Sequence, residues 1–577
     1  MRLRLLLSLA LLLTCLPAAT VPATAATAAG ARWPSLEEQL ARDRVPAGSA
    51  LARLIAENQE IDLLRPAEVH DKMGLPPWLR VLWRKQHPEG EYLASDPTGG
   101  YPLILKEFHE WMVEHPDLQP VMDEPDAGQV EEKAASAGPD RVVSGSLGSR
   151  AESDIRVNYW DPSRIVASSN NLFRGVMSMY YSSDGGATWG STLLPLTESD
   201  EFQSDPAVEW TSDGTAWTSF IGIERGGNGL SLRLRAFRSS DGGAHWTPDG
   251  DISGDQTFAD KQMMWTDHSE RSPFKDHLYA IWHNGAPVFV NRRTGPDGAW
   301  GDPIRVSGSE TRGTGIGSDI KTNSAGHVFA LWPDTGSRKI YLARSLNGGA
   351  TYSKPVVVAK LFNSFNIVIP AQSRRASLLY VTAGAFLNGR KSNVYAAWMD
   401  LTGTKGCKTP LDDPRENVRS TCKSRIWFSK SINGGQRWSK PRMINNAPTL
   451  SDQFNPWMVV DETTGALGII YYDTAGEDRT RVNVWYQSSF NEGTTWTAPL
   501  RLTSASSSTA DGSTEFQFGD YNGLSGIAGT FFPIWTDRRD GGTETVWTVQ
   551  IDDHKSLVCK AAEEDFLSAV AAGVCGR

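Results

Sequence analysis

One short pattern recurs along the chain, and this repeat limits the possible folds more than any other feature. Each copy reads approximately Ser-x-Asp/Asn-Gly-Gly-x-x-aromatic. An Asp or Asn side chain can accept hydrogen bonds from nearby backbone N–H groups, and Gly tolerates a positive φ, so each copy predicts a tight turn between two strands. Spacings of roughly 50 to 60 residues, once longer, indicate stacked supersecondary units. The copies are residues 182–189, 239–246, 345–352, 431–438 and 489–496, with a shortened one at 296–300.

A second pattern lies upstream of each turn and defines the repeating unit. The first strand of a unit begins near an Asp, and some 15 to 20 residues later an aromatic strand ends in a polar residue, as a repeat architecture would place them. Seven units fit the chain better than six. The last unit has no turn motif and lacks a fourth strand, which residues 141–149 could supply, and such a closure removes free sheet edges.

The repeated turn resembles the Asp box of sialidases and related bacterial neuraminidase repeat proteins, over roughly Asp154 to Ile551. The resemblance implies an all-β fold, a β-propeller in which each box closes a blade, and an exo-sialidase-like glycoside hydrolase. The box itself is not catalytic, so it points to a fold more than to a reaction. The expected partner is a glycan or glycoconjugate.

The remainder of the chain predicts export and a modular organisation. Arg2 and Arg4, a following apolar run and small residues near position 25 predict a signal peptide and hence a secreted protein, extracellular or periplasmic. Four cysteines remain after its removal, which favours two local disulfides. The predicted parts are a signal peptide (1–26), a helical N-terminal region (31–121), an acidic linker (122–140), the propeller (141–553) and a disulfide-tied tail (554–577). The predicted pairs are Cys407 with Cys422 and Cys559 with Cys575.

Charge and spacing exclude several classes of function. The net charge of -10 and pI near 5.6 argue against general nucleic-acid binding, which needs a basic face. No segment after the signal peptide has the length and apolarity to cross a bilayer. The cysteine spacings do not resemble a zinc site, so no metal is expected there. Asp249, Asp251 and Ser253 resemble a calcium loop that would end at Asp260, although the segment also fits an ordinary acidic turn.

Meander topology predicts where the polar residues gather. The start of the first strand and the end of the second lie on one face of a blade, and the repeated turns lie on the other. An inner ring of aspartates should therefore surround the mouth of the central channel, where closely spaced carboxylates raise one another's pKa. Each Asp could instead cap a loop or tie neighbouring blades together. The inner ring is Asp154, Asp205, Asp260, Asp319, Asp452 and Asp520, and the outer one is Asp334, Asp400, Asp473 and Asp537.

The resemblance also suggests roles for particular residues. A sialidase needs an arginine cluster for the substrate carboxylate, an Asp acid/base, and a Tyr nucleophile activated by Glu. Residues 521–524 (YNGL) are similar to the late YSxL segment of that family, which makes Tyr521 the candidate nucleophile. The chain has no Arg-Ile-Pro tripeptide. The other catalytic candidates are Asp205, Asp260 and Glu310, and the substrate-binding candidates are Arg156, Arg312, Arg538 and Asp520.

Three functions therefore remain open at this stage. The first is a sialidase-like hydrolase acting on terminal acidic sugars of glycans. The second is a non-catalytic propeller that binds glycan or protein, which the missing tripeptide favours. The third is a carbohydrate-active enzyme of another specificity, such as a polysaccharide lyase. An arginine cluster near Tyr521 would favour the first, and a mouth with carboxylates but no arginine cluster would favour the second or third.

Overall fold

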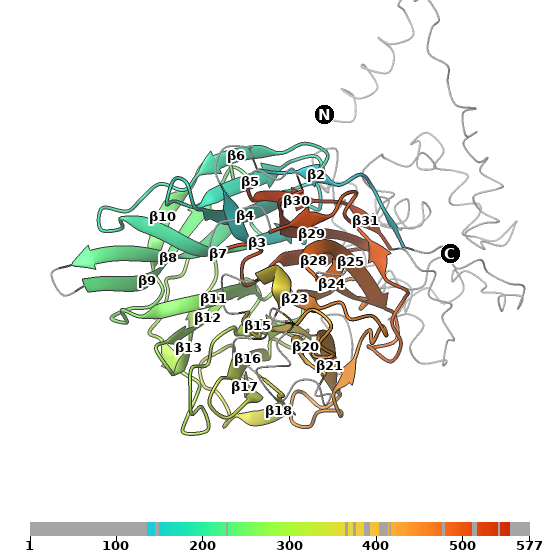
Figure 1. Cartoon of the computed structure of the whole chain (residues 1–577). Coiled ribbons are helices and arrows are strands. Elements are labelled where there is room, and N and C mark those ends of the chain that lie inside the picture. Colours follow the sequence, from blue (N-terminus) through green and yellow to red (C-terminus); the bar gives the residue numbers. More distant parts are fainter. Residues whose placement is uncertain are drawn as a thin grey trace, which may run out of the picture.

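The computed structural model describes residues 135–553, apart from 145–148, 227–228, 364–366, 368, 373–376, 386–392, 403–413, 415–416, 476–478, 510–515 and 540–542. The predicted signal peptide, helical N-terminal region and C-terminal tail lie outside the described residues. The described part is all β, with seven antiparallel sheets arranged as blades around a central axis (Figure 1). The prediction of a seven-bladed propeller is confirmed.

Each blade is a meander whose first strand faces the axis and whose last strand lies at the rim. Blades 1 to 3 consist of β3 (Arg150–Val157), β4 (Ile165–Asn171), β5 (Ser178–Ser182) and β6 (Gly190–Leu193); β7 (Phe202–Trp210), β8 (Ala216–Gly226), β9 (Gly229–Ser239) and β10 (Thr247–Asp251); and β11 (Ala259–Thr266), β12 (Leu278–Asn284), β13 (Val288–Arg293) and β14 (Ile304–Arg305).

Blades 4 to 7 follow the same order. They consist of β15 (Asp319–Thr322), β16 (Val328–Asp334), β17 (Lys339–Ser345) and β18 (Val356–Lys360); β19 (Val381–Ala385), β20 (Val394–Leu401), β21 (Ser424–Ser431) and β22 (Arg442–Met443); β23 (Gln453–Val460), β24 (Leu467–Ala475), β25 (Arg481–Ser489), β26 (Leu500–Arg501) and β27 (Ser507–Ser508); and β28 (Gly523–Ile527), β29 (Thr530–Asp537) and β30 (Thr545–Thr548), with the short β1 (Ser136–Ala137), β2 (Arg141–Val142) and β31 (Ile551–Asp552).

The N-terminal strand closes the ring. β2 pairs with β30, with Arg141 opposite Thr548 and Val142 opposite Trp547. Figure 1 shows β2, in light blue, beside the red strands of the last blade. The prediction that the segment beginning at Arg141 supplies the missing fourth strand is confirmed for Arg141–Val142, and the pairing covers an edge of the seventh blade.

The repeated turns share one hydrogen-bond pattern. In the first copy the Ser182 hydroxyl donates to Asp184 and accepts from the Gly186 N–H, while Asp184 accepts from the Thr188 N–H. The two glycines have positive φ, which an L side chain would resist. The same bonds recur at Ser239, Ser345, Ser431 and Ser489. These turns therefore stabilise the third-to-fourth strand connections of blades 1, 2, 4, 5 and 6 and face away from the channel mouth.

Aromatic pairs fill the space between the second and third strands of five blades. Such directly opposed pairs stabilise antiparallel sheets. In blades 3, 4, 5 and 7 the second-strand member is a fully buried tryptophan. The pairs are Trp282 with Phe289, Trp332 with Tyr341, Trp398 with Trp427, Tyr471 with Trp485 and Trp535 with Trp547.

The structure bears on two further predictions, the disulfides and the absence of a membrane-spanning segment, only in the described residues. Cys422 is buried and disulfide-bonded. Cys407, Cys559 and Cys575 lie outside the described residues, so both pairings stay predictions. Within the described ranges, no helix is long and apolar enough to span a membrane.

Candidate functional site at the mouth of the channel

Four inner strands bulge at one level, close to their N-terminal ends. At each bulge a residue other than glycine adopts a positive φ, between 44° and 55°. The register shifts lie at these residues in β3, β7, β11 and β23. Such backbone costs about 1–3 kcal/mol per residue and clusters at functional sites. The four residues are Glu152, Asp205, Lys261 and Asn455, all polar.

Lys261 is the centre of this mouth. Its Nζ lies 2.8 Å from Asp205 Oδ2, 2.9 Å from Asp520 Oδ2 and 3.7 Å from Glu152 Oε1. Blades 1, 2, 3 and 7 thus meet through one ammonium group. Asn170 at the end of β4 supports the cluster, because its Nδ2 donates to Glu152 and its Oδ1 accepts from the Asp205 N–H. Among the described residues, these three carboxylates share the ammonium of Lys261.

Asp205 and Asp260 have pKa values shifted in opposite directions. Burial acts to raise the pKa of Asp205, but attraction to Lys261 and the hydrogen bond from it outweigh burial and lower the pKa to about 2. Burial raises the pKa of Asp260; Lys261 opposes this rise, and repulsion from Asp205 adds to it. Neighbouring carboxylates with diverging pKa values are the usual arrangement of an acid and its ionised partner.

His283 faces Asp260 from the neighbouring strand. The two are opposite each other in β12 and β11, with His283 Nε2 at 3.7 Å from Asp260 Oδ2. His283 Nδ1 lies 2.9 Å from the Gly285 carbonyl oxygen, which assigns the ring proton to Nδ1. Burial lowers the pKa of His283. Nε2 is thus an acceptor without a hydrogen-bond partner in the described part of the chain, and a protonated Asp260 can donate towards it.

Asp260 is also the most accessible carboxylate of the mouth. Its side chain is 33% exposed, compared with 4% or less for Asp205, Asp520 and Glu152. Two exposed aromatic residues stand at the same ends of the inner strands: Phe258, just before β11, is 62% exposed and Phe202, at the start of β7, is 45% exposed. A ligand at this mouth would meet Asp260, the tip of Lys261 and these rings first.

Tyr521 lies beside the cluster but is covered. Its hydroxyl donates to the Pro206 carbonyl oxygen at 3.2 Å, and the ring packs against Tyr380 and Trp457. The residue is 1% exposed. Burial raises its pKa well above the ordinary value, and the negative charges of Asp205 and Glu152 add to the effect. The structure therefore brings together Tyr521, Asp205, Asp260 and Asp520, four of the residues predicted from sequence.

Arg156 lies at the other end of the channel. Its Nε donates to Glu209 at 2.7 Å, and its guanidinium lies over Trp265. Glu209 also contacts His268 Nε2 at 3.3 Å, and His268 Nδ1 is 2.8 Å from Glu462. Blades 3 and 6 are not neighbours, so the His268–Glu462 contact crosses the axis. We call Arg156, Glu209, His268 and Glu462 the basal network.

The remaining predicted residues are not part of the mouth cluster. Glu310 accepts hydrogen bonds from the Gly308 N–H and the Thr311 hydroxyl in its own loop. Arg312 is exposed and follows in that loop, where its N–H donates to Asp334. Arg538 is buried and donates to the Ser508 carbonyl oxygen. In the described residues no arginine side chain is seen to join the ion pairs of Lys261.

Other aspartates of the two predicted rings have structural partners. Asp154 accepts from the Val208 N–H and Asp319 from the Ala383 N–H, so both tie adjacent blades. Asp452 pairs with Arg479 at 2.6 Å. In the outer ring Asp334 and Asp400 accept backbone N–H groups, Asp473 accepts from Gln453, and Asp537 pairs with Arg539.

The residues of the predicted calcium loop face arginines. Asp249 pairs with Arg293 at 2.9 Å, and Asp251 pairs with Arg235 at 2.7 Å. The Ser253 N–H donates to Asp251. Within the described residues no group of three or more His, Cys, Asp or Glu side chains could hold a metal ion.

Sequence reasoning missed Glu152, His283 and Asn170. The repeat alignment assigned Asp154 to the mouth level, but the bulge in β3 gives that level to Glu152. A non-glycine residue with positive φ leaves no recognisable mark in a sequence. His283 and Asn170 lie at the polar ends of second strands, and this position in the repeat could have predicted that both residues lie near the mouth.

Comparisons with known proteins show a fold likeness only. No protein-family profile matches the chain, and no curated protein matches it. A protein of unknown function from Dyadobacter fermentans aligns with a TM-score of 0.42 at 12% identity, covering 73% of this chain and 100% of that one. An α-L-arabinofuranosidase from Fusarium graminearum aligns with a TM-score of 0.38 at 12% identity, covering 60% of this chain and 92% of that one. The NanB sialidase from Streptococcus pneumoniae aligns with a TM-score of 0.35 at 11% identity, covering 72% of this chain and 70% of that one.

Proposed function

We propose that the chain is a glycoside hydrolase that cleaves neutral glycans at the channel mouth, with Asp260 as general acid. The observation that carries the proposal is the pair Asp260 and Asp205, which both contact Lys261, one at its backbone N–H and the other at its ammonium, with pKa values shifted apart. Glycoside hydrolysis needs a protonated carboxyl to transfer a proton to the leaving oxygen while negative charge stays nearby. Asp260 is the accessible member, as a proton donor to substrate must be.

The carboxylates of the mouth favour the transition state of this reaction. Positive charge develops on the sugar ring as the glycosidic bond breaks. In the described part of the chain Asp205, Asp520 and Glu152 lie around one ammonium, and ionised carboxylates there stabilise that positive charge. Lys261 holds the three groups in place, and burial strengthens their effect because less water screens it.

The same carboxylates support neutral rather than acidic substrates. A sugar carboxylate would meet three carboxylates, and the cation among them already has ion-pair partners. Phe258 and Phe202 offer exposed aromatic faces on which an uncharged sugar ring can lie. We infer that these rings orient the substrate next to Asp260.

A second candidate is cleavage of terminal acidic sugars with Tyr521 as the nucleophile. The position of Tyr521 next to Asp205 and Glu152 favours it. In this mechanism the substrate would have to displace the hydrogen bond between Tyr521 and Pro206 and find a cation other than Arg156.

One experiment separates the two candidates. The purified protein is incubated with fluorogenic neutral glycosides, neutral polysaccharides and a fluorogenic sialoside, and the Asp260→Asn and Tyr521→Phe variants are run in parallel. The proposal predicts turnover of a neutral substrate that Asp260→Asn removes and Tyr521→Phe largely keeps. Turnover of the sialoside alone, lost in Tyr521→Phe, would establish the second candidate. No turnover of any substrate would contradict both.

A further inference from the structure

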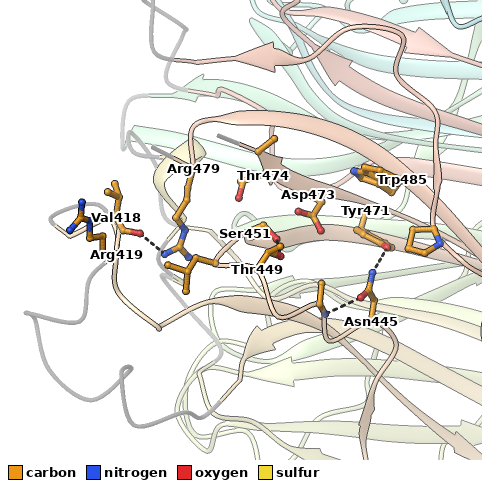
Figure 2. Close-up of a pocket in the computed structure, with 14 residues that line it drawn as sticks. Val418, Arg419, Asn445, Thr449, Ser451, Tyr471, Asp473, Thr474, Arg479 and Trp485 are labelled. Carbon is orange, nitrogen blue, oxygen red and sulfur yellow. Dashed lines mark hydrogen bonds between the residues drawn. The ribbon is translucent and has the colours of Figure 1, made fainter. Parts of the chain in front are cut away.

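A cavity of about 760 Å³ opens between blades 5 and 6, on the same face as the channel mouth. Its walls come from the segment after β22, the end of β24, the residues before β23 and the middle of β25. Figure 2 shows Asp473 and Tyr471 in its middle, Trp485 at one side, and Ser451 and Thr449 opposite. The volume is that of a typical small-molecule site.

The cavity lies beside a second strand that lacks the buried tryptophan of blades 3, 4, 5 and 7. In blades 3, 4, 5 and 7 a buried tryptophan occupies the second strand, and Trp332 fills the space next to the preceding blade by donating to Thr311 at 3.0 Å. Blade 6 has Tyr471 at this position. Tyr471 donates to Gln487 and accepts from Asn445 of the blade 5 connection at 3.3 Å. Departures from a consistent local rule are typical of functional positions.

The lining combines one aromatic wall with a few polar groups. Trp485 is half-buried, and no hydrogen bond of its indole N–H is seen in the described residues. Asp473 is partly exposed and accepts hydrogen bonds from the side chains of Gln453, at 2.9 Å, and Ser451; a carboxylate has about four acceptor sites, so acceptor capacity remains. Hydroxyl groups of Thr449 and Ser451 face the same space. A ring with one apolar face and several hydroxyl groups fits this combination.

Among the described residues that line the cavity, the buried cation already has an ion-pair partner. Arg479 is buried, and its Nε and Nη2 bind both oxygens of Asp452 at 2.9 and 2.6 Å. Arg419 also lines the cavity and is exposed. Asp473, in its middle, is attracted to the nearby Arg425 and Lys423, so the charges at the cavity largely offset one another, which suits a neutral ligand.

We infer that this cavity is a second glycan-binding site, which holds one or two neutral sugar units against Trp485 with their hydroxyl groups on Asp473. It goes beyond the proposed function, since it needs no catalysis at Asp260. Its location on the mouth face would let it hold a distant part of a polysaccharide whose cleaved bond lies at the mouth. A site of this kind contributes to binding of long chains and has no effect on short substrates.

Calorimetric titration of the full-length protein tests this inference. Cellohexaose, maltohexaose, xylohexaose and arabinohexaose serve as probes, with hexagalacturonic acid as the anionic comparator, all in the Asp260→Asn background so that nothing is cleaved. At least one neutral probe should bind, and the acid should bind no more tightly than that probe. Trp485→Ala should weaken binding at least tenfold, and Tyr471→Trp, which introduces the residue of blades 3, 4, 5 and 7, should narrow the cavity and do the same.

Trp427→Ala is the matched control, because Trp427 has the same register position in blade 5, is also half-buried, and does not line the cavity. It should leave binding within twofold. Binding of no neutral probe, tighter binding of the acid, or binding that survives in both Trp485→Ala and Tyr471→Trp would overturn the inference. Failure of the proposed function appears elsewhere, as absent turnover of short glycosides by the unsubstituted protein, so the two failures are distinguishable.

Discussion

The two ends of the central channel each hold a cluster of buried charges, but they differ in how far the charges are enclosed. In the basal network Arg156 and His268 share Glu209, and His268 reaches Glu462 on the opposite side of the axis. At the mouth one ammonium meets three buried carboxylates, and a fourth carboxyl, Asp260, remains partly exposed. Enclosed charges hold blades together, whereas a partly exposed carboxyl can exchange protons with a ligand.

The bulges follow the same division. The four positive-φ residues at bulges of inner strands, Glu152, Asp205, Lys261 and Asn455, all lie at the mouth level. At the base, positive φ occurs in turns, at Asp276 and Ala528. The bulges at the mouth aim polar side chains into a shared space, which supports a functional role for the mouth.

The largest expected effect is on catalysis at the mouth. Asp260→Asn should lower kcat/KM on a neutral polysaccharide by about 10²–10⁴-fold, the usual contribution of a general acid. Its melting temperature should stay within a few degrees of the parent, because the side chain is partly exposed. Initial rates and thermal unfolding measured on the same preparation check this. A loss of activity that parallels unfolding would contradict a chemical role.

The counterpart at the base is a loss of stability. Glu209→Gln leaves Arg156 and His268 without their shared carboxylate and should cost about 3–5 kcal/mol in the free energy of unfolding. Activity per folded molecule should change less than threefold. Urea unfolding followed by tryptophan fluorescence gives the first quantity. A variant as stable as the parent would show that the network does not tie the blades.

The two ends should also respond to opposite pH changes. Burial acts to lower the pKa of His268, but Glu462 and Glu209 outweigh it and raise the pKa from 6.5 to about 10. The stability that protonated His268 contributes is therefore complete below pH 6.5 and lost as pH rises to about 10. Asp205, whose pKa falls from 3.8 to about 2, contributes stability above pH 3.8 that is lost as pH falls towards 2.

Urea midpoints across the pH range check this, with His268→Gln and Asp205→Asn as the paired variants. His268→Gln should flatten only the alkaline decline, and Asp205→Asn only the acid one. If either variant altered the opposite limb, the assignment of charges to the two ends would be wrong.

The smallest expected effect concerns the central cation. Lys261→Met removes the attraction that keeps the pKa of Asp205 low and opposes the raised pKa of Asp260. Both limbs of the pH–rate profile should therefore shift to higher pH by about one pH unit. Unchanged limbs would mean that neither carboxylate controls the rate.

The sequence allowed the fold and part of the site to be predicted, for identifiable reasons. Each repeated turn is encoded by local side-chain and glycine chemistry, so the blades could be counted and the role of residues 141–149 inferred from one missing strand. Asp205, Asp260 and Asp520 were assigned to the mouth by strand order alone. The bulges were not predictable from the sequence. The bulge in β3 places Glu152, instead of Asp154, at the mouth level. Arg156, four residues beyond Glu152 on the same strand, lies roughly 13 Å further along the channel at about 3.3 Å per residue.

The most direct test of the mouth as an acid–base site is the dependence of Asp260→Asn on the leaving group. A 2,4-dinitrophenyl glycoside needs no proton at its leaving oxygen, whereas a methylumbelliferyl or sugar leaving group does. The kcat of Asp260→Asn relative to the parent should be close to unity with the first substrate and at least 100-fold lower with a sugar leaving group, the size expected of lost general-acid catalysis. Equal losses with all leaving groups would contradict the role of Asp260 as the proton donor.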